Sequence, residues 1–317
     1  MDYPHAADCW YLSGPTASGK TGIGVQIARL LDAEIISLDS MAIYRDMDIG
    51  TAKPTPDERD GVPHHLIDIV SPCDEFSVAE YVEQAHRTIG EIRARGRVPL
   101  FVGGTPLYLK AMLRGLFEGP PADDSLRAEL QQIADSEGTH SLHRRLEEVD
   151  PASAERLHPN DARRIIRALE VHRLTGRPIS EFQKQFDSPA TAGPFRVFVL
   201  DWPREVLYER INQRVDMMIR EGLVDEVRRL LAQWSPLGKT ASQAVGYREV
   251  IEHFDGRHSL GRAVELIKTH SRQFAKRQGT WFRSLVECRF INMPEFESAE
   301  SAALHIRNSG IGPDGSL

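Results

Sequence analysis

The chain has 317 residues, of which 41% are hydrophobic and 27% are charged. These values are typical of globular proteins and exclude general disorder. The length predicts one large core and a smaller lobe. The formal net charge is −7, which excludes bulk adhesion to nucleic acid, so any site for a polyanion has to be a local patch.

The three cysteines, Cys9, Cys73 and Cys288, are far apart and form no CxxC or Cys/His cluster. This spacing excludes a disulfide framework and a zinc site, and it is typical of a reducing cytosol. The N-terminal segment lacks the basic and apolar regions of a signal peptide. No apolar run approaches the length of a membrane span, so we expect a cytoplasmic protein without membrane contact.

Strands and helices alternate in the first part of the chain. The predicted strands are residues 10–12, 34–38, 98–102 and 195–200, with a shorter one at 289–292. Helices are predicted from Gly19 to Leu31 and from the N-cap Ser77 to about Arg95. Alternation of this kind indicates βαβ units and a parallel sheet flanked by helices, which is an α/β fold.

The pattern changes after Gly119-Pro120-Pro121, where charged helical faces replace strands up to about residue 184. We therefore expect a helical insertion at 120–190 within an α/β core formed by 1–119 and 191–295. The last segment, 296–317, is rich in Gly and Ser toward its end and is predicted to be a flexible tail.

A phosphate-binding loop follows the first strand. The sequence matches GxxxxGK[ST] without a mismatch and lies between a predicted strand and a predicted helix, as the mechanism of the motif requires. Backbone N–H groups and the helix N-terminus would face one anion, Lys20 would contact the outer phosphate oxygens, and the Thr21 hydroxyl would ligate Mg²⁺. The eight residues are Gly14, Pro15, Thr16, Ala17, Ser18, Gly19, Lys20 and Thr21.

Two further motifs end predicted strands at the edge where open parallel sheets bind ligands. Asp39 follows the second strand and can serve as a general base, although a strand-end Asp also caps turns. Gly103-Gly104-Thr105 follows the third strand, where glycines allow close backbone approach and Thr105 supplies a hydroxyl.

Other candidates leave two interpretations open. Lys53 adds a second cation to the site or is a solvated loop lysine. Arg210 and Arg214 lie four residues apart on one helix face and either clamp a diphosphate or form surface ion pairs. For His64-His65 the absence of a third ligand favours a structural role.

Two segments are basic in a chain that is acidic overall. Residues 151–184 have seven Arg or Lys against four Asp or Glu, and residues 262–283 have six against one, giving +3 and +5. Such faces either are solvated surface or contact the phosphate backbone of a nucleic acid. The phosphate loop is equally ambiguous, because a nucleotide and a prenyl diphosphate present the same groups to it.

The motifs taken together resemble the bacterial tRNA dimethylallyltransferase family. The resemblance covers roughly residues 8–292. It rests on seven separated segments in the same order, which are GPTASGKT (14–21), DSMAIYRDMDIGTAKP (39–54), HHLID (64–68), VGGTPLYLKAML (102–113), LHPNDARRIIRALEV (157–171), AVGYRE (244–249) and AKRQGTWFR (275–283).

The resemblance implies transfer of a dimethylallyl group from dimethylallyl diphosphate to N6 of the adenosine that follows the anticodon in tRNA, position 37. The phosphate loop would hold the diphosphate with Mg²⁺, Asp39 would be the general base, and Arg214 would contact the diphosphate. A monomer that binds the anticodon stem-loop is expected. The implied catalytic residues are Asp39, Thr105, Lys20 and Arg214. The implied tRNA contacts are Asp39, Ser40, Met41, Ala42, Thr105, Arg127, Arg163, Arg164, Ile165, Ile166, Arg167, Gln243, Ala244, Val245, Gly246, Tyr247 and Arg248.

Three alternatives remain. A small-molecule kinase would use the same loop for ATP, with the 151–184 segment as its lid. An adenylate isopentenyltransferase would use the same donor on AMP, but AMP requires neither the insertion nor the basic C-terminal helix. An RNA-binding module with a vestigial loop is disfavoured because Lys20, Thr21 and Asp39 are intact.

Overall fold

The computed structural model describes residue 6 and residues 8–116, 119–183 and 196–311. These residues divide into two compact units. The larger unit contains the residues before Arg114 and those from 196 onward, and the smaller contains Arg114 to Gln183. The expected insertion, 120–190, falls in the smaller unit, and its expected end at residue 190 lies outside the described residues.

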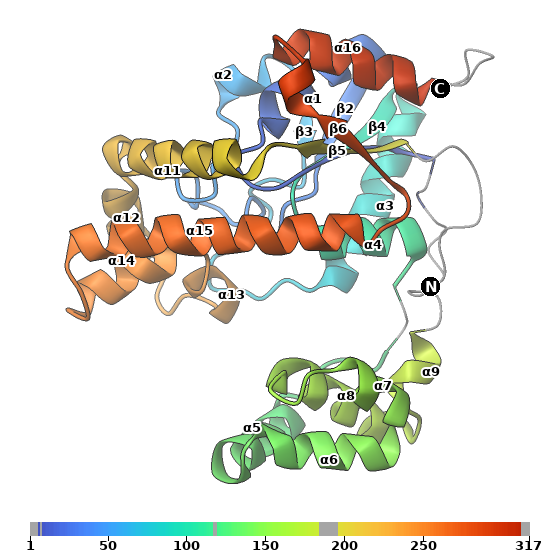
Figure 1. Ribbon diagram of the computed structural model, residues 1–317, viewed down its shortest axis with the longest axis vertical. Coiled ribbons are helices and arrows are strands. Elements are labelled where there is room, and N and C mark those ends of the chain that lie inside the picture. The colour runs from blue at the N-terminus through green and yellow to red at the C-terminus, as the bar shows by residue number, and fades with distance from the viewer. Residues whose placement is uncertain (1–5, 7, 117–118, 184–195, 312–317) are drawn as a thin grey trace. The chain divides into compact units, whose positions relative to one another are not determined.

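A six-stranded parallel sheet forms the centre of the larger unit, which confirms the predicted α/β class (Figure 1). The strand order is β3-β2-β4-β1-β5-β6. The strands are β1 (Trp10–Ser13), β2 (Ala33–Ser37), β3 (His64–His65), β4 (Val98–Val102), β5 (Arg196–Asp201) and β6 (Cys288–Asn292). Five of them match the predicted strands to within two residues, and Phe195, the predicted start of β5, lies outside the described residues. The strand β3 was not predicted, because two residues are too few to show an alternating pattern.

Helices cover both faces of the sheet. Alternate residues of one strand point to opposite faces. Trp10 and Leu12 of β1 pack with α1 (Lys20–Leu31) and α16 (Ala299–Gly310), whereas the Tyr11 ring stacks on Phe101 on the other face, with centroids 4.8 Å apart. The helices α3 (Val78–Ala94) and α4 (Pro106–Arg114) meet through stacked Tyr81 and Tyr108. Ser77 caps α3 in a capping box, as predicted.

The C-terminal helices add a second core around the loop that follows β2. They are α11 (Arg204–Glu221), α12 (Leu223–Gln233), α13 (Lys239–Ser242), α14 (Tyr247–Phe254) and α15 (Leu260–Arg283), and α2 (Pro56–Arg59) lies earlier in the chain. Tyr44 and Met47 pack among buried side chains of these helices, including Val227 and Val250. Within the described part of the chain, no helix is both long and apolar enough to cross a membrane.

The predicted flexible tail is wrong for residues 299–310. Ser298 caps α16, which packs on α1, and Ala302, Ala303 and Ile306 are buried there. Gly310 lies so close to the Trp10 ring that a β-carbon would clash with it. The segment is preceded by the short 3-10 helix η1 (Met293–Glu295), and residues 312–317 of the predicted tail lie outside the described residues.

The smaller unit is helical throughout its described part, as the charge pattern predicted. Its helices are α5 (Asp124–Glu137), α6 (Thr139–Val149), α7 (Pro151–Arg156), α8 (Ala162–Thr175) and α9 (Ile179–Phe182). They enclose their own core, which includes Leu130, Leu142, Leu146, Ile165 and Leu169. A separate core of this kind lets the unit keep its shape independently of the sheet.

Candidate active site

The eight predicted phosphate-loop residues connect β1 to α1. Gly14 and Gly19 have positive φ values of 149° and 93°, which other residues rarely adopt, and Gly19 is the N-cap of α1. The loop therefore turns tightly and directs the N-terminus of α1 toward the edge of the sheet where the strands end. This is the geometry that binds phosphate groups.

Side chains that follow β5 in the sequence hold the loop from outside. The indole Nε1 of Trp202 donates to the carbonyl of Ser18 at 3.0 Å, and Arg210 Nε donates to the carbonyl of Ala17 at 2.8 Å. The Arg210 guanidinium also lies 4.7 Å from the centre of the Trp202 ring. The two arginines of the predicted pair therefore differ in their contacts, because Arg210 binds the loop backbone and Arg214 does not.

Lys20 lies against the loop and Arg214 completes a positive site beside it. Lys20 Nζ donates to the carbonyls of Gly14 and Pro15, at 3.0 and 2.8 Å. Burial and, to a smaller extent, the Arg214 charge lower the pKa of Lys20 to about 7, although the Asp39 charge acts in the opposite direction. Burial likewise lowers the pKa of Arg214, and no described residue forms a hydrogen bond or ion pair with its guanidinium. A half-buried arginine without a carboxylate partner is suited to an anionic ligand.

Asp39 caps the turn that follows β2, which is one of the two interpretations that the sequence left open. Its Oδ1 accepts hydrogen bonds from the backbone N–H groups of Met41 and Ala42, at 2.8 and 3.3 Å, so the carboxylate caps the turn. Its Oδ2 has no hydrogen-bond partner among the described residues, and the carboxylate acts electrostatically on both Lys20 and Arg214. One oxygen therefore fixes the group, while the other has no partner among the described residues.

Thr105 lies beside this turn, as predicted. Its Oγ1 accepts from the Ser40 N–H at 3.0 Å and donates to Ser40 Oγ at 3.3 Å. A β-carbon at Gly103 would clash with the backbone of Leu38, so the glycine allows the ends of β2 and β4 to approach closely. The structure thus brings together the phosphate loop, Asp39, Ser40, Thr105 and Arg214.

The Thr21 hydroxyl is compatible with a metal bound through phosphate. Thr21 lies in the first turn of α1, is partly exposed, and has no hydrogen bond to a described side chain. The described residues contain no cluster of three or more His, Cys, Asp or Glu side chains that could hold a metal by themselves. Mg²⁺ commonly keeps several waters and takes few protein ligands together with substrate phosphates, so Thr21 fits such an ion.

Lys53 and the two histidines have structural roles and are not part of this site. Lys53 is buried and its ammonium contacts Asp48, Asp68 and the carbonyl of Tyr44, so it adds no free cation. His65 Nε2 lies 2.6 Å from buried Glu34. The structural role predicted for the histidines is therefore correct, although they lie in a strand and not in a loop.

In the smaller unit, some of the predicted tRNA-contacting arginines form ion pairs within the protein and others do not. Glu170 is fully buried and accepts from Arg127 at 2.9 and 3.0 Å and from Arg167 at 2.6 Å. Arg163 is exposed and has no partner among the described residues, whereas exposed Arg164 pairs with Asp161. Ile165 and Ile166 are buried in the core, so their side chains cannot contact RNA.

The segment 243–248, which was predicted to contact tRNA, is also partly buried. Ala244 and Tyr247 are buried, and the Tyr247 hydroxyl donates to Glu226. Arg248 Nη2 donates to the fully buried carboxylate of Glu249 at 2.6 Å. Exposed Gln243 and the partly exposed Val245 and Arg248 are the side chains of this segment that could reach a ligand.

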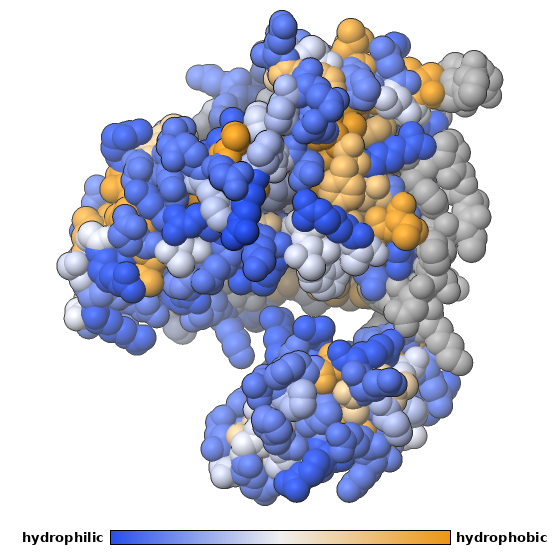
Figure 2. Space-filling view, viewed as in Figure 1, coloured by the Kyte–Doolittle hydropathy of each residue, from blue (hydrophilic) through white to orange (hydrophobic). Residues whose placement is uncertain are grey.

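The basic segment 262–283 forms most of α15, whose surroundings appear largely hydrophilic in Figure 2. Lys268 pairs with Asp216 at 2.8 Å, and Arg283 lies 3.3 Å from Asp201. Lys276 and Arg277 remain exposed, and Arg277 lies over the ring of exposed Phe274. Part of the +5 charge counted in the sequence is therefore already neutralised.

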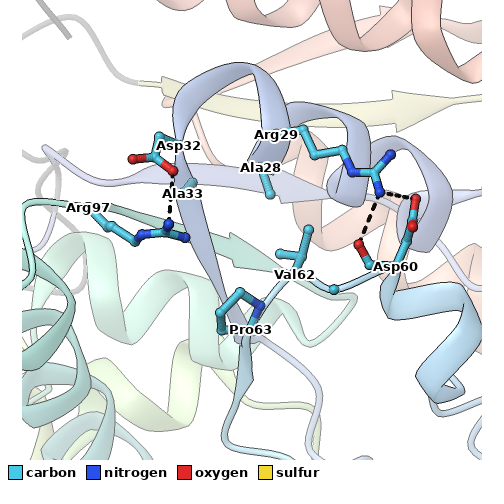
Figure 3. A pocket seen from close by; sticks show the side chains of 9 residues that line it. Ala28, Arg29, Asp32, Ala33, Asp60, Val62, Pro63 and Arg97 are labelled. Carbon is cyan, nitrogen blue, oxygen red and sulfur yellow. Dashed lines mark hydrogen bonds and ion pairs between the residues drawn. The ribbon is translucent and has the colours of Figure 1, made fainter.

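A hollow at the opposite end of the strands carries no ligand-binding chemistry of this kind. It lies at Ala33, where β2 begins, and Figure 3 shows its two arginines turned toward carboxylates. Arg29 pairs with Asp60, and Arg97 lies 3.3 Å from Asp32. Since both guanidinium groups are engaged, we place the site at the phosphate loop.

Sequence reasoning missed three residues that shape this site, namely Trp202, Arg210 as a loop contact, and Gln278. Gln278 accepts from the Thr16 N–H at 2.9 Å and donates to the Gly104 carbonyl at 2.6 Å. Each contact joins residues at least 174 positions apart, so no local pattern could reveal it. The sequence carries no signal for Gln278, because a second glutamine, Gln273, lies among the same basic residues of α15.

Known proteins match most of the chain. The family described as IPP transferase matches residues 42–285, and that described as isopentenyl transferase matches residues 7–70. A tRNA dimethylallyltransferase of Rhodopirellula baltica is 49% identical over 92% of this chain and 90% of its own length. One of Geobacter metallireducens is 48% identical over 92% of this chain and 95% of its own.

Solved structures agree. The tRNA isopentenylpyrophosphate transferase of Bacillus halodurans is 42% identical with a TM-score of 0.69, covering 95% of this chain and 94% of that one. A eukaryotic dimethylallyltransferase acting on tRNA is 26% identical with a TM-score of 0.75, covering 98% and 82%. With these matches over nearly its full length, the chain belongs to the IPP transferase family, an enzyme family that includes the tRNA dimethylallyltransferases.

Proposed function

We propose that the protein transfers a dimethylallyl group from dimethylallyl diphosphate to N6 of adenosine 37, next to the anticodon of tRNA. The observation that carries this proposal is the juxtaposition of Lys20, Arg214 and Asp39. Two cations lie beside a phosphate loop, and a carboxylate with one free oxygen acts electrostatically on both.

In the reaction, the N6 nitrogen forms a bond to the donor carbon that carries the diphosphate. The bond between this carbon and the diphosphate oxygen breaks. Negative charge grows on the departing diphosphate, where the loop N–H groups, Lys20 and Arg214 stabilise it. Asp39 Oδ2 takes the proton that N6 loses. A general base of this kind contributes roughly 100- to 10,000-fold to the rate.

Mg²⁺ is the proposed cofactor, and the Thr21 hydroxyl would help to hold it. When bound, it supplies positive charge to the leaving diphosphate. The adenine has to leave the stacked anticodon loop to reach the site, at a cost of a few kcal/mol. Phosphate contacts from exposed arginines such as Arg163 would offset this cost.

We further propose that a monomer is sufficient and that it acts in the cytoplasm. All donor-site residues, from Gly14 to Arg214, belong to the larger unit of one chain. The partner RNA is the anticodon stem-loop, for which the insertion and α15 supply the basic residues. This separates the proposal from transfer to AMP, which is too small to contact such surfaces.

The test is incubation with labelled dimethylallyl diphosphate, Mg²⁺ and unmodified tRNA, followed by digestion and nucleoside analysis. We expect labelled N6-dimethylallyladenosine in the tRNA, little product when AMP replaces tRNA, and no consumption of ATP. Labelled AMP with unlabelled tRNA, or phosphate transfer from ATP, would reject the proposal.

A further inference from the structure

Gln278 lies at the meeting point of three segments that are far apart in the sequence. It belongs to α15, is 4% exposed, and uses both ends of its side-chain amide. Oε1 accepts from the Thr16 N–H of the phosphate loop at 2.9 Å, and Nε2 donates to the Gly104 carbonyl at 2.6 Å. The amide thereby joins the phosphate loop to the turn that follows β4.

Gly104 packs closely against this amide. A β-carbon on Gly104 would lie 2.7 Å from Gln278 Nε2, 3.2 Å from the Gly14 carbonyl and 3.6 Å from Lys20 Nζ. Gly104 is therefore the residue across which the glutamine and the catalytic lysine face each other. A shift of Gln278 would reach Lys20 and the start of the loop through this contact.

The chemistry of the position requires a neutral group that both donates and accepts. A glutamate would keep the acceptor for Thr16 but lose the donor for Gly104, and it would bring a negative charge toward the diphosphate. A methionine of similar length would lose both hydrogen bonds and leave the partly buried Thr16 N–H and the buried Gly104 carbonyl unpaired. Glutamine is the side chain that satisfies both segments without charge.

We propose that Gln278 is the positioning residue of the donor site, which holds Thr16 and Gly104 so that the loop N–H groups and Lys20 converge on the diphosphate. It touches neither the donor nor the RNA in this role. Only the expected change in KM rests on the proposed function. The effect of Gln278 on the phosphate loop can be measured by hydrogen exchange without any reaction.

The experiment compares Q278E and Q278M with Q273E and Q273M. Gln273 lies on the same helix, is exposed, and has no hydrogen-bond partner among the described residues, so it controls for the change of side chain. Three quantities are measured for each variant: amide hydrogen exchange of peptides covering 14–19 and 103–105, affinity for inorganic diphosphate, and the KM values for donor and tRNA. Thermal unfolding of each variant shows that the folded protein is being compared.

We expect faster exchange in both peptides for the Gln278 variants and no change for the Gln273 variants. Diphosphate affinity should fall roughly tenfold in Q278M, as for the loss of buried hydrogen bonds, and further in Q278E because of its charge. The KM for the donor should rise in parallel, while the KM for tRNA stays near the wild-type value.

Unchanged exchange in 14–19 in both folded Gln278 variants would overturn the inference. So would a loss of thermal stability without any change in diphosphate affinity, because the amide would then be purely structural. If no variant, including the wild type, transfers a prenyl group while the exchange differences are present, the proposed function fails and the positioning role remains.

Discussion

The Tyr247 hydroxyl donates a 2.6 Å hydrogen bond to the buried carboxylate of Glu226. The same carboxylate accepts from three consecutive backbone N–H groups, those of Asp48, Ile49 and Gly50, at 3.2, 2.8 and 3.2 Å. Gly50 packs so closely on the Tyr247 ring that a β-carbon would clash with it. Glu226 of α12 therefore fixes the loop after Asp39 to the C-terminal helices.

Glu226→Gln is expected to destabilise the protein by about 2 kcal/mol, because an amide places donors against backbone donors. Tyr247→Phe, which removes one hydrogen bond, should cost about 1 kcal/mol. Urea unfolding measures both, with exposed Glu221→Gln as the control. Equal stability of Glu226→Gln and Glu221→Gln would contradict the network.

Asp39→Asn is expected to reduce kcat by roughly 100- to 10,000-fold while tRNA affinity stays close to the wild-type value. Asparagine retains the Oδ1 acceptor that caps the turn at Met41, so the loss would be one of proton acceptance. Single-turnover kinetics and RNA binding measure the two effects. Turnover near the wild-type rate would remove Asp39 from the mechanism.

The affinity for diphosphate is expected to decrease as pH rises above about 7. Burial and the nearby Arg214 lower the pKa of Lys20 to about 7, so the ammonium that binds the anion is lost as the pH passes this value. The decrease can reach tenfold per pH unit until the pKa of the complex is reached. Calorimetry with inorganic diphosphate between about pH 7 and 9 tests this.

Because diphosphate itself titrates in this range, the informative quantity is the ratio of wild-type affinity to that of Lys20→Met. This ratio should decrease with pH. Lys276→Met, which alters an exposed lysine on α15, should follow the wild type at every pH. A ratio independent of pH would mean that Lys20 keeps its proton throughout the range.

Arg163→Ala and Arg127→Ala are expected to act differently on the insertion. Arg163 is exposed and unpaired among the described residues, so its removal should weaken binding of an anticodon stem-loop and lower the salt slope by about one without changing stability. Arg127 is bound to buried Glu170, so its removal should mainly destabilise the unit. Fluorescence anisotropy over a salt series and thermal unfolding measure both, and identical behaviour of the two variants would refute the distinction.

The pKa of Glu34 is lowered to about 2 by hydrogen bonds from Arg95 and His65, despite the burial that acts against this. A carboxylate with a depressed folded-state pKa stabilises the fold above its ordinary value of 4.5, and this contribution is lost as pH falls toward about 2. Glu34→Gln should therefore flatten the loss of stability in this acid range. Unfolding at several acid pH values, with exposed Glu83→Gln as the comparison, provides the measurement.

The sequence predicted local features and could not predict contacts between distant ones. The phosphate loop, the strands and Ser77 as a cap depend on neighbouring residues, and the structure contains each of them. Asp39 and Thr105 were placed together correctly because both follow predicted strands at one edge of the sheet, whereas Arg214 was assigned to this site only by the family resemblance. The roles of Gln278 and Trp202 depend on tertiary contacts with the phosphate loop, and these cannot be read from the spacing of residues in the sequence.

Two failures have a common physical reason. α16 was taken for a flexible tail because its Gly and Ser content suggested weak structure, yet small Ala302 and Ala303 allow it to approach α1 closely. Lys53 was considered a free cation because lysine is usually exposed, but its ammonium is buried and pairs with Asp48 and Asp68. In both cases tertiary packing overrode a residue's average behaviour.

The side chains that hold the phosphate loop are synthesised long after the loop itself. The ribosome produces residues 14–21 early, but Trp202, Arg210 and Gln278 are added only after the insertion is complete. A nascent chain therefore carries the motif for most of its translation without the contacts that shape it. Fragments that end before α15 therefore carry the phosphate-loop motif without Gln278, one of the side chains that hold the loop in the folded protein.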